Sequence, residues 1–151
     1  MIKTISFHTQ LGWISAVEKN NKILSISFGK LKNAGRSSKL QKLEKNLNDY
    51  FAVKTKALNF NITDILMVGS NLQIKIWKEL IKIPYGKTKS YGDIAKKVKT
   101  SPRYVGNVCG QNKHLIVIPC HRVIRSDGSL GGFSAPDGIN IKKKLLDLEK
   151  Q

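Results

Sequence analysis

A run of four consecutive aliphatic residues ends at a proline in the last third of the chain. The run covers residues 115–118, and Pro119 follows it directly. A short, continuous apolar run is typical of a buried strand. Pro119 must end such a strand, because proline has no N–H to give to the ladder. We therefore expect a strand over 115–118, with Cys120 at its end and facing a cavity.

The residues after Pro119 combine a thiol, an imidazole and a guanidinium, in Cys120, His121 and Arg122. A thiol attacks only as its thiolate, and a neighbouring base or cation favours that form. The alternative is a packing role, because most free cysteines behave as small buried apolar residues. The neighbours of Cys120 favour the reactive interpretation.

The first part of the chain alternates between apolar and polar residues over 2–28, with interruptions at Gly12 and at 19–22. Alternation of this kind predicts a small antiparallel sheet. Apolar residues at helical spacing over 37–51 predict a helix of about four turns that packs on the sheet.

Weaker signals follow that helix. Phe60 and Ile62 suggest one more strand, and the stretch 63–70 lacks strong periodicity, which indicates a connection. We therefore expect two domains, an N-terminal scaffold over 1–66 and a second domain over 67–151.

Capping and breaking residues divide the second domain into helices. The expected elements are a helix from Ser70 or Asn71 that ends before Pro84 and Gly86, helices over 91–98 and 101–110, a turn over 125–129 between short strands, and a helix over 139–150. Ser101 and Pro102 suit the start of the third helix. The second and third helices, joined by the tight turn at 99–100, predict a helix-turn-helix.

The charge predicts a polyanionic partner. Lysine and arginine number 27 against 10 for aspartate and glutamate, which gives a net charge of +17. DNA, RNA or an acidic membrane surface fits such an excess, although charges spread along a chain are also compatible with a solvated surface. Three of the four arginines, Arg103, Arg122 and Arg125, lie near Cys120 in sequence. Together with the helix pair they favour DNA.

The cysteine content predicts a reduced, intracellular protein. Cys109 and Cys120 are the only two cysteines, and no segment approaches the roughly 20 apolar residues of a membrane span. The cysteines and His8, His114 and His121 lack the paired spacing of metal ligands. We expect no metal, no structural disulfide, no membrane association and a cytoplasmic location.

Several short motifs follow one another between about Leu72 and Glu149, and their order and spacing are informative. They are Trp77-Lys78-Glu79-Leu80, Ile83-Pro84-Tyr85-Gly86, Ser90-Tyr91-Gly92-Asp93-Ile94-Ala95, Ser101-Pro102-Arg103-Tyr104-Val105-Gly106, Asn112, Pro119-Cys120-His121-Arg122-Val123, Gly131-Gly132-Phe133-Ser134 and Leu145-Leu146-Asp147-Leu148-Glu149. In order and spacing the chain resembles the O6-alkylguanine-DNA alkyltransferases, also called methylated-DNA–protein-cysteine methyltransferases.

The resemblance implies an α+β fold, with a ribonuclease H-like N-terminal domain followed by a winged helix-turn-helix-like C-terminal domain. It implies direct transfer of an alkyl group from O6-alkylguanine in double-stranded DNA, with O4-alkylthymine as a further candidate substrate. The base must leave the stack before it can react. The thioether product implies one irreversible reaction per molecule, carried out by a monomer without a cofactor.

For the chemistry, the resemblance assigns four residues. Cys120 accepts the alkyl group, and His121 acts on it through a bridging water. Glu149 orients His121, which follows the general logic of base-activated nucleophiles. Tyr91 rotates the target phosphate and donates a hydrogen bond to the guanine ring.

For DNA binding, the resemblance implies a helix that enters the minor groove, where the sequence code is degenerate. Arg103 takes the place of the extruded base in the stack. The full set expected to contact DNA is Tyr91, Arg103, Tyr104, Gly106, Asn107 and Arg122. Tyr104 departs from the family pattern, because alanine is common at its position.

For the pocket, the resemblance implies that backbone groups of Cys120, Val123 and Ser134 face the guanine edges. It also implies that Phe133 stacks on the base. Asn112 is the hinge between the recognition helix and the active-site turn. Cys109 stands where an alkyl side chain is common, and it could be a second, weaker thiol.

Two other functions compete with repair. A non-catalytic DNA module, such as a damage sensor or a regulator, would use the helix pair without a reactive cysteine. A Cys-His hydrolase would need an oxyanion site and steady turnover. The presence of Cys120 argues against the first, and release of more than one product per protein would favour the second.

Overall fold

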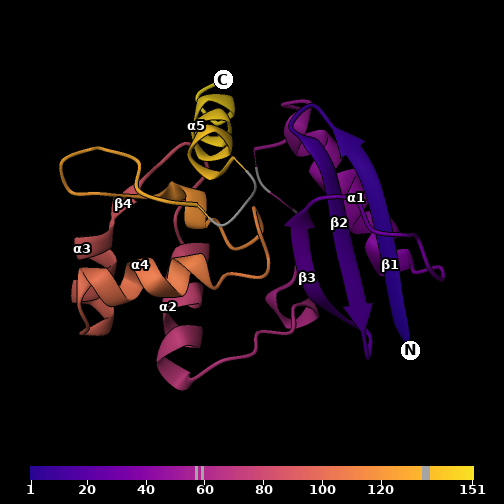
Figure 1. Ribbon diagram of the computed structural model, residues 1–151, viewed down its shortest axis with the longest axis horizontal. Coiled ribbons are helices and arrows are strands. Elements are labelled where there is room, and N and C mark those ends of the chain that lie inside the picture. The colour runs from indigo at the N-terminus through magenta and orange to yellow at the C-terminus, as the bar shows by residue number, and fades with distance from the viewer. Residues whose placement is uncertain (57, 59, 134–136) are drawn as a thin grey trace. The chain divides into compact units, whose positions relative to one another are not determined.

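The computed structural model describes residues 1–56, 58, 60–133 and 137–151, which form two compact units (Figure 1). The first unit contains residues 1–67 and 113–115, and the second contains residues 68–112 and 116–151. A small antiparallel sheet and several helices confirm the predicted mixture of α and β structure. The sequence did not reveal that residues 113–115 belong with the first unit.

Three strands form the sheet of the first unit, in the order β1 (Ile2–Thr9), β2 (Gly12–Lys19) and β3 (Lys22–Phe28). Neighbouring strands pair antiparallel, which confirms the predicted sheet. Asn20 and Asn21 connect β2 to β3 with φ angles of 51° and 63°. Two successive residues in the left-handed region give the tight turn whose twist suits a hairpin, and asparagine tolerates this region better than most residues.

Helix α1 (Ser38–Phe51) packs against β1 and β2, as the sequence predicts. It begins where the hydroxyl of Ser37 accepts a hydrogen bond from the backbone N–H of Leu40, at 3.1 Å, which satisfies one of the free amides of the first turn. The residues that α1 buries are spaced along one face, and they are Leu40, Leu43, Leu47, Tyr50 and Phe51.

The strand predicted at Phe60 and Ile62 is wrong. A 3₁₀ helix, η1 (Ile62–Asp64), occupies this part of the first unit. The side chain of Asn61 accepts a hydrogen bond from the backbone N–H of Thr63 at 3.0 Å. Such a local bond from an asparagine favours a turn over an extended strand.

Residues 113–115 lie along β3. The backbone N–H of Ile26 donates to the carbonyl of Lys113 at 2.7 Å, and that of Leu115 donates to the carbonyl of Ile26 at 3.1 Å. Nε2 of His114 lies 2.9 Å from the carbonyl of Ile23. These bonds tie the segment that precedes Pro119 to the sheet.

The second unit contains the three predicted helices, α2 (Asn71–Ile81), α3 (Tyr91–Val98) and α4 (Pro102–Gly110). Serines at positions 70, 90 and 101 cap their N-termini, which confirms the predicted starts. Lys99, with a φ of 61°, ends α3 in the left-handed conformation common after helices. The indole N–H of Trp77 donates to the carbonyl of Val108 at 3.2 Å and joins α2 to α4.

The strand predicted over 115–118 is wrong, although all four residues are buried. The backbone turns at 116–117, where Ile116 has a φ of 73°. Pro119 then has φ −81° and ψ 64°, and the N–H of Cys120 donates to the carbonyl of Ile118 at 2.8 Å, which is an inverse γ-turn. A short apolar run alone does not distinguish a strand from a buried turn.

The turns lead into a 3₁₀ helix, η2 (Cys120–Arg122), and then into β5 (Val123–Ile124), which pairs in parallel with β4 (Lys89–Ser90). The predicted turn over 125–129 is confirmed by the 2.9 Å bond from the N–H of Arg125 to the carbonyl of Ser129. No strand follows this turn in the described residues 130–133, so the strand predicted on its far side is wrong.

Helix α5 (Gly138–Leu148) confirms the last predicted helix and turns Ile141, Leu145 and Leu148 inward. Among the residues that the structure describes, no helix is long and apolar enough to cross a membrane.

Candidate active site

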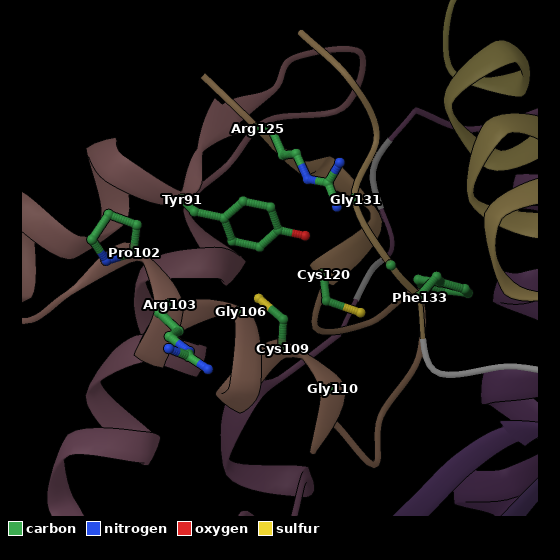
Figure 2. A pocket seen from close by; sticks show the side chains of 11 residues that line it. Tyr91, Pro102, Arg103, Gly106, Cys109, Gly110, Cys120, Arg125, Gly131 and Phe133 are labelled. Atoms are coloured by element: carbon green, nitrogen blue, oxygen red, sulfur yellow. The ribbon is translucent and has the colours of Figure 1, made fainter. Parts of the chain in front are cut away.

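One pocket of the second unit, with a volume of about 620 Å³, gathers side chains from α3, α4 and η2 and from the segment after β5 (Figure 2). A cavity of this size can enclose a small organic group. The residues that line it are Tyr91, Pro102, Arg103, Gly106, Cys109, Gly110, Cys120, Arg125, Gly131, Gly132 and Phe133.

Cys120 begins η2, and it is 3% exposed. The side-chain amide of Asn112 donates to Sγ of Cys120 at 3.2 Å and to the carbonyl of Ile118 at 2.8 Å. Burial raises the pKa of Cys120 to about 11, against the opposing effects of the Asn112 bond and the charge of Lys142. The resting thiol is therefore protonated near neutral pH, and reaction requires a base.

His121 is fully buried and lies next to a carboxylate. Its Nε2 is 2.7 Å from Oε2 of Glu149. Since an ionised carboxylate only accepts hydrogen bonds, Nε2 carries the proton and Nδ1 has the free lone pair. Within the described part of the chain, Nδ1 has no hydrogen-bond partner although it is buried. This nitrogen is the basic atom of the site.

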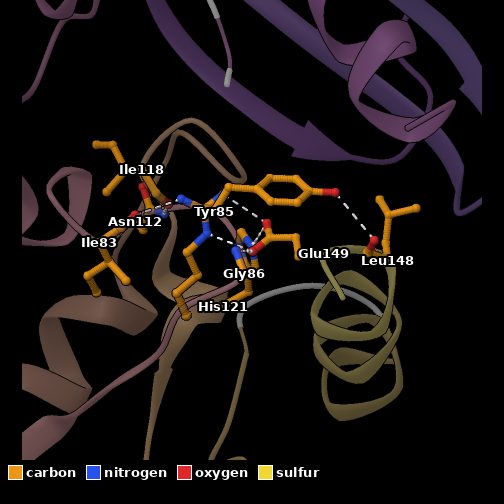
Figure 3. A network of polar contacts seen from close by, with 9 residues as sticks. Ile83, Tyr85, Gly86, Asn112, Ile118, His121, Leu148 and Glu149 are labelled. Carbon is orange, nitrogen blue, oxygen red and sulfur yellow. Dashed lines mark hydrogen bonds and ion pairs between the residues drawn. The ribbon is translucent and has the colours of Figure 1, made fainter. Parts of the chain in front are cut away.

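Glu149 is held from three sides (Figure 3). Nε and Nη2 of Arg122 donate to its two oxygens at 2.8 and 2.9 Å, and the N–H of Gly86 donates at 3.3 Å. Burial opposes the ionisation of Glu149, but the bonds from His121 and Arg122 outweigh it and hold its pKa below the ordinary value. The carboxylate is therefore charged over the whole physiological range.

Arg122, which is predicted to contact DNA, is bonded to Glu149. Its side chain is 11% exposed, and Nη1 also donates to the carbonyl of Ile83 at 2.8 Å. A guanidinium that is bonded to a buried carboxylate and a carbonyl has few donors left for an external phosphate. Arg122 holds Glu149 in place, and its contact with DNA stays a prediction.

Tyr91, the first residue of α3, projects its hydroxyl into the pocket (Figure 2). Burial, followed by the charges of Cys109 and Cys120, raises its pKa to about 12, so the hydroxyl keeps its proton. Nζ of Lys142 donates to Oη of Tyr91 at 3.3 Å and to the carbonyl of Gly132 at 3.2 Å. Because Oη accepts from Lys142, its own hydrogen is available to a group in the pocket.

Lys142 is a fully buried cation on α5. Its Nζ lies 5.6 Å from the ring centre of Tyr91, within the range of a cation–π contact. Burial lowers its pKa, while charge on Cys120 or Cys109 would raise it. Lysine is almost never fully buried unless it is paired, and here it lies within electrostatic range of both thiols.

The four residues predicted to contact DNA from α4 lie on or near its accessible side. Arg103 and Asn107 are exposed, and Tyr104 and Gly106 are partly exposed. Arg103 and Gly106 also line the pocket. This helix therefore presents one surface that includes the pocket mouth.

Besides Cys120, three residues are predicted to contact the base, and the structure describes two of them, Phe133 and Val123. Only one of these two lines the pocket. Phe133 lines the pocket, whereas Val123 is buried in β5 and its side chain is not among the lining residues. Ser134 lies outside the described residues.

Comparisons with known proteins place this geometry in a family. The sequence profile described as the 6-O-methylguanine DNA methyltransferase DNA-binding domain matches residues 71–151, which is more than half of the chain. The chain belongs to the methylated-DNA–protein-cysteine methyltransferase family. The matched residues include α3, α4 and η2, which line the pocket, and α5, which carries Lys142.

Two archaeal methylated-DNA–protein-cysteine methyltransferases are similar over almost their full length. That of Sulfolobus acidocaldarius is 38% identical, over 95% of this chain and 90% of its own. That of Metallosphaera sedula is 34% identical, over 99% of this chain and 94% of its own. The solved structure of Mycobacterium tuberculosis OGT in complex with DNA has a TM-score of 0.84 and 29% identity, over 97% of this chain and 92% of that one.

Two residues of this family member were missed as site residues from the sequence. Lys142 interrupts the inward-facing residues of α5 between Ile141 and Leu145, and a lysine at such a position is the signal that could have revealed it. Arg125 lines the pocket after β5, although the sequence suggested only that arginines cluster near Cys120.

Proposed function

We propose that the protein removes alkyl groups from O6 of guanine in double-stranded DNA and keeps them on Sγ of Cys120. As a member of its family it is a methylated-DNA–protein-cysteine methyltransferase with DNA as its partner. One observation carries the choice of acceptor. Sγ of Cys120 lines the pocket and accepts a hydrogen bond from Asn112, and the next residue along the chain is a histidine bonded to a buried carboxylate.

The reaction begins with removal of the thiol proton. Nδ1 of His121 takes it, through a water in the relay that the family resemblance implies, and Glu149 stabilises the imidazolium that forms. The thiolate then attacks the alkyl carbon in line with its bond to O6. A new S–C bond forms as the C–O bond breaks, and the released guanine takes up a proton.

Charge on the thiolate and on the leaving base is balanced by two groups. Lys142, whose positive charge favours the thiolate of Cys120, stabilises the nucleophile as its proton leaves. The hydroxyl of Tyr91, oriented by Lys142, donates to the guanine ring as it becomes negative. The effect of Lys142 is strengthened by its burial, because little water is present to screen its charge.

The base reaches the thiol by rotation out of the duplex. Unstacking and unpairing cost a few kcal/mol, and Arg103 offsets part of this cost by filling the gap in the stack. Its exposed position in the first turn of α4, at the mouth of the pocket, supports this role. Tyr104, Gly106 and Asn107 follow along the same helix and face the minor groove.

Inside the pocket, Phe133 stacks on the base, and the backbone groups of Val123 and Ser134 bind its edges. Asn112 couples the end of α4 to the active-site turn. Its backbone N–H donates to the carbonyl of Cys109 at 3.2 Å, while its side chain donates to Cys120. Phe133 supports the stacking role by lining the pocket.

We also infer the finer features that the resemblance implies. The first unit is a ribonuclease H-like scaffold, the second is a winged helix-turn-helix-like domain, and the domain boundary lies near residue 66.

The protein acts as a monomer in the cytoplasm, close to the genomic DNA. It needs no cofactor, because the lesion supplies the alkyl group. The thioether is stable, so each molecule reacts once, and O4-alkylthymine is a second substrate.

An intact-mass experiment tests the proposal. The protein is incubated with a duplex that contains O6-methylguanine and then digested with trypsin, which separates residues 104–113 from residues 114–122. One methyl group per protein is expected, on the peptide that contains Cys120, and none with Cys120→Ala. A methyl group on the Cys109 peptide alone, or several guanines repaired per protein, would contradict the proposal.

A further inference from the structure

The pocket contains a second thiol that the proposed repair reaction does not use. Cys109 lies in the last turn of α4, is 7% exposed and lines the same pocket as Cys120. Figure 2 shows both side chains at the pocket, below the ring of Tyr91. These are the only cysteines of the chain.

Asn112 fixes the two cysteines relative to each other. Its backbone N–H donates to the carbonyl of Cys109, and its side-chain amide donates to Sγ of Cys120, each at 3.2 Å. The two thiols also interact electrostatically. Burial raises the pKa of Cys109 to about 12, and the charge of Cys120 contributes to the increase. Asn112 therefore links the backbone of Cys109 to the side chain of Cys120, and both cysteines line one cavity.

We propose that this pocket converts a 2-haloethyl lesion into a bridge between its two cysteines, Cys120–S–CH₂–CH₂–S–Cys109. The substrate class is guanine alkylated at O6 by a two-carbon group that carries a second leaving group. The inference rests on the proposed function, since Cys120 must first receive the group.

The bridge forms in two steps. Sγ of Cys120 bonds to the carbon attached to O6, the C–O bond breaks, and the thiol proton passes to guanine. The sulfur lone pair then displaces chloride from the second carbon and forms a three-membered sulfonium ring. Sγ of Cys109 opens this ring, and its proton and the chloride leave to solvent. Because Cys109 is protonated near neutral pH, the second step speeds up as pH rises.

Thiol counting tests the bridge, because the chain has two cysteines. Freshly prepared O6-(2-chloroethyl)guanine is compared with O6-ethylguanine, which lacks the second leaving group. The ethyl compound is expected to leave one free thiol. The chloroethyl compound is expected to leave none, with an ethylene bridge joining the tryptic peptides 104–113 and 114–122. In Cys109→Ala, the group stays on Cys120 as a chloroethyl or hydroxyethyl thioether.

If the wild-type protein retains one free thiol after chloroethyl transfer, the bridge is excluded. Failure of O6-ethylguanine to modify Cys120 would instead count against the proposed function. A second reagent, dibromobimane, decides the inference without any guanine, because it fluoresces fully only after joining two thiols. Native protein is expected to become fluorescent, and Cys109→Ala and Cys120→Ala to lose that signal. A non-fluorescent native protein would overturn the inference.

Discussion

Nε2 of His121 lies 2.7 Å from Oε2 of Glu149, and both side chains are closed off from solvent. The two residues are 28 positions apart in the sequence, on η2 and at the end of α5. This bond fixes the tautomer of the imidazole and leaves Nδ1 as its basic atom. The residue that ends α5 thereby belongs to the candidate active site.

Glu149→Gln is expected to slow alkyl transfer and to destabilise the fold. Glutamine cannot stabilise an imidazolium, and it leaves the buried guanidinium of Arg122 without a counter-charge. Breaking a buried ion pair on one side costs about 3–5 kcal/mol. Single-turnover transfer and chemical denaturation measure the two effects. Asp147→Asn, on the exposed side of α5 with Lys150 as its partner, is the matched control and should change neither by much.

Both His121 and Glu149 should make the free energy of unfolding fall as the solution becomes acidic. Burial lowers the pKa of His121 below its ordinary 6.5. The hydrogen bonds from His121 and Arg122 hold the pKa of Glu149 below its ordinary 4.5, against the effect of burial. In each case the unfolded chain binds the proton more readily, so stability is complete above the ordinary pKa and is lost as pH falls towards the folded value. Denaturation midpoints should therefore decline from about pH 6.5 downwards. Midpoints that rise in this range would contradict the assignment.

Gly131→Ala is expected to displace Tyr91. A Cβ at this position would lie 2.7 Å from Oη of Tyr91, and Gly131 has a φ of 73°, which other residues rarely adopt. A shift of about 1 Å in a catalytic group can slow a reaction by about 100-fold. Gly132→Ala is the control, since a Cβ there meets no atom within 4 Å. Transfer from O6-methylguanine is measured for both, and equal rates would show that the hydroxyl of Tyr91 is not needed in its present position.

Lys142→Met is expected to raise the pKa of Cys120 and to slow its alkylation. Methionine has a similar length and suits a buried site, but it carries no charge to favour the thiolate. A rise of one pKa unit would reduce the thiolate about tenfold. The pH dependence of reaction with iodoacetamide reports this pKa. Lys143→Met, an exposed neighbour on α5, should leave the profile in place, and an unchanged profile in Lys142→Met would remove Lys142 from the mechanism.

Arg103→Ala is expected to separate base extrusion from chemistry. Without the guanidinium, repair of a methylated duplex should slow, because nothing offsets the lost stacking. Reaction with free O6-benzylguanine needs no extrusion and should keep its rate. If Arg103 only contacts a phosphate, the variant should instead bind undamaged and damaged DNA less tightly by the same factor. The slope of the logarithm of the binding constant against the logarithm of salt concentration should then fall by about one.

Local sequence signals were sufficient for most of the helices and strands. Serine caps, the asparagine turn between β2 and β3, and helical spacing act over a few residues, so they can be recognised without the fold. The errors occurred where local signals were ambiguous. Residues 115–118 are buried, as an apolar run predicts, but burial is a property of the tertiary structure that strands and turns share.

The helices, the sheet and the motif that places a thiol before an imidazole depend on residues close together in the chain. The partners of the charged residues depend instead on how distant segments fold together. Arg122 and Lys142 are both basic residues that a sequence assigns to the surface or to DNA, yet one binds Glu149 and the other lies buried beside Tyr91. Burial removes the water that would screen these charges, so residues distant in sequence control the chemistry of Cys120.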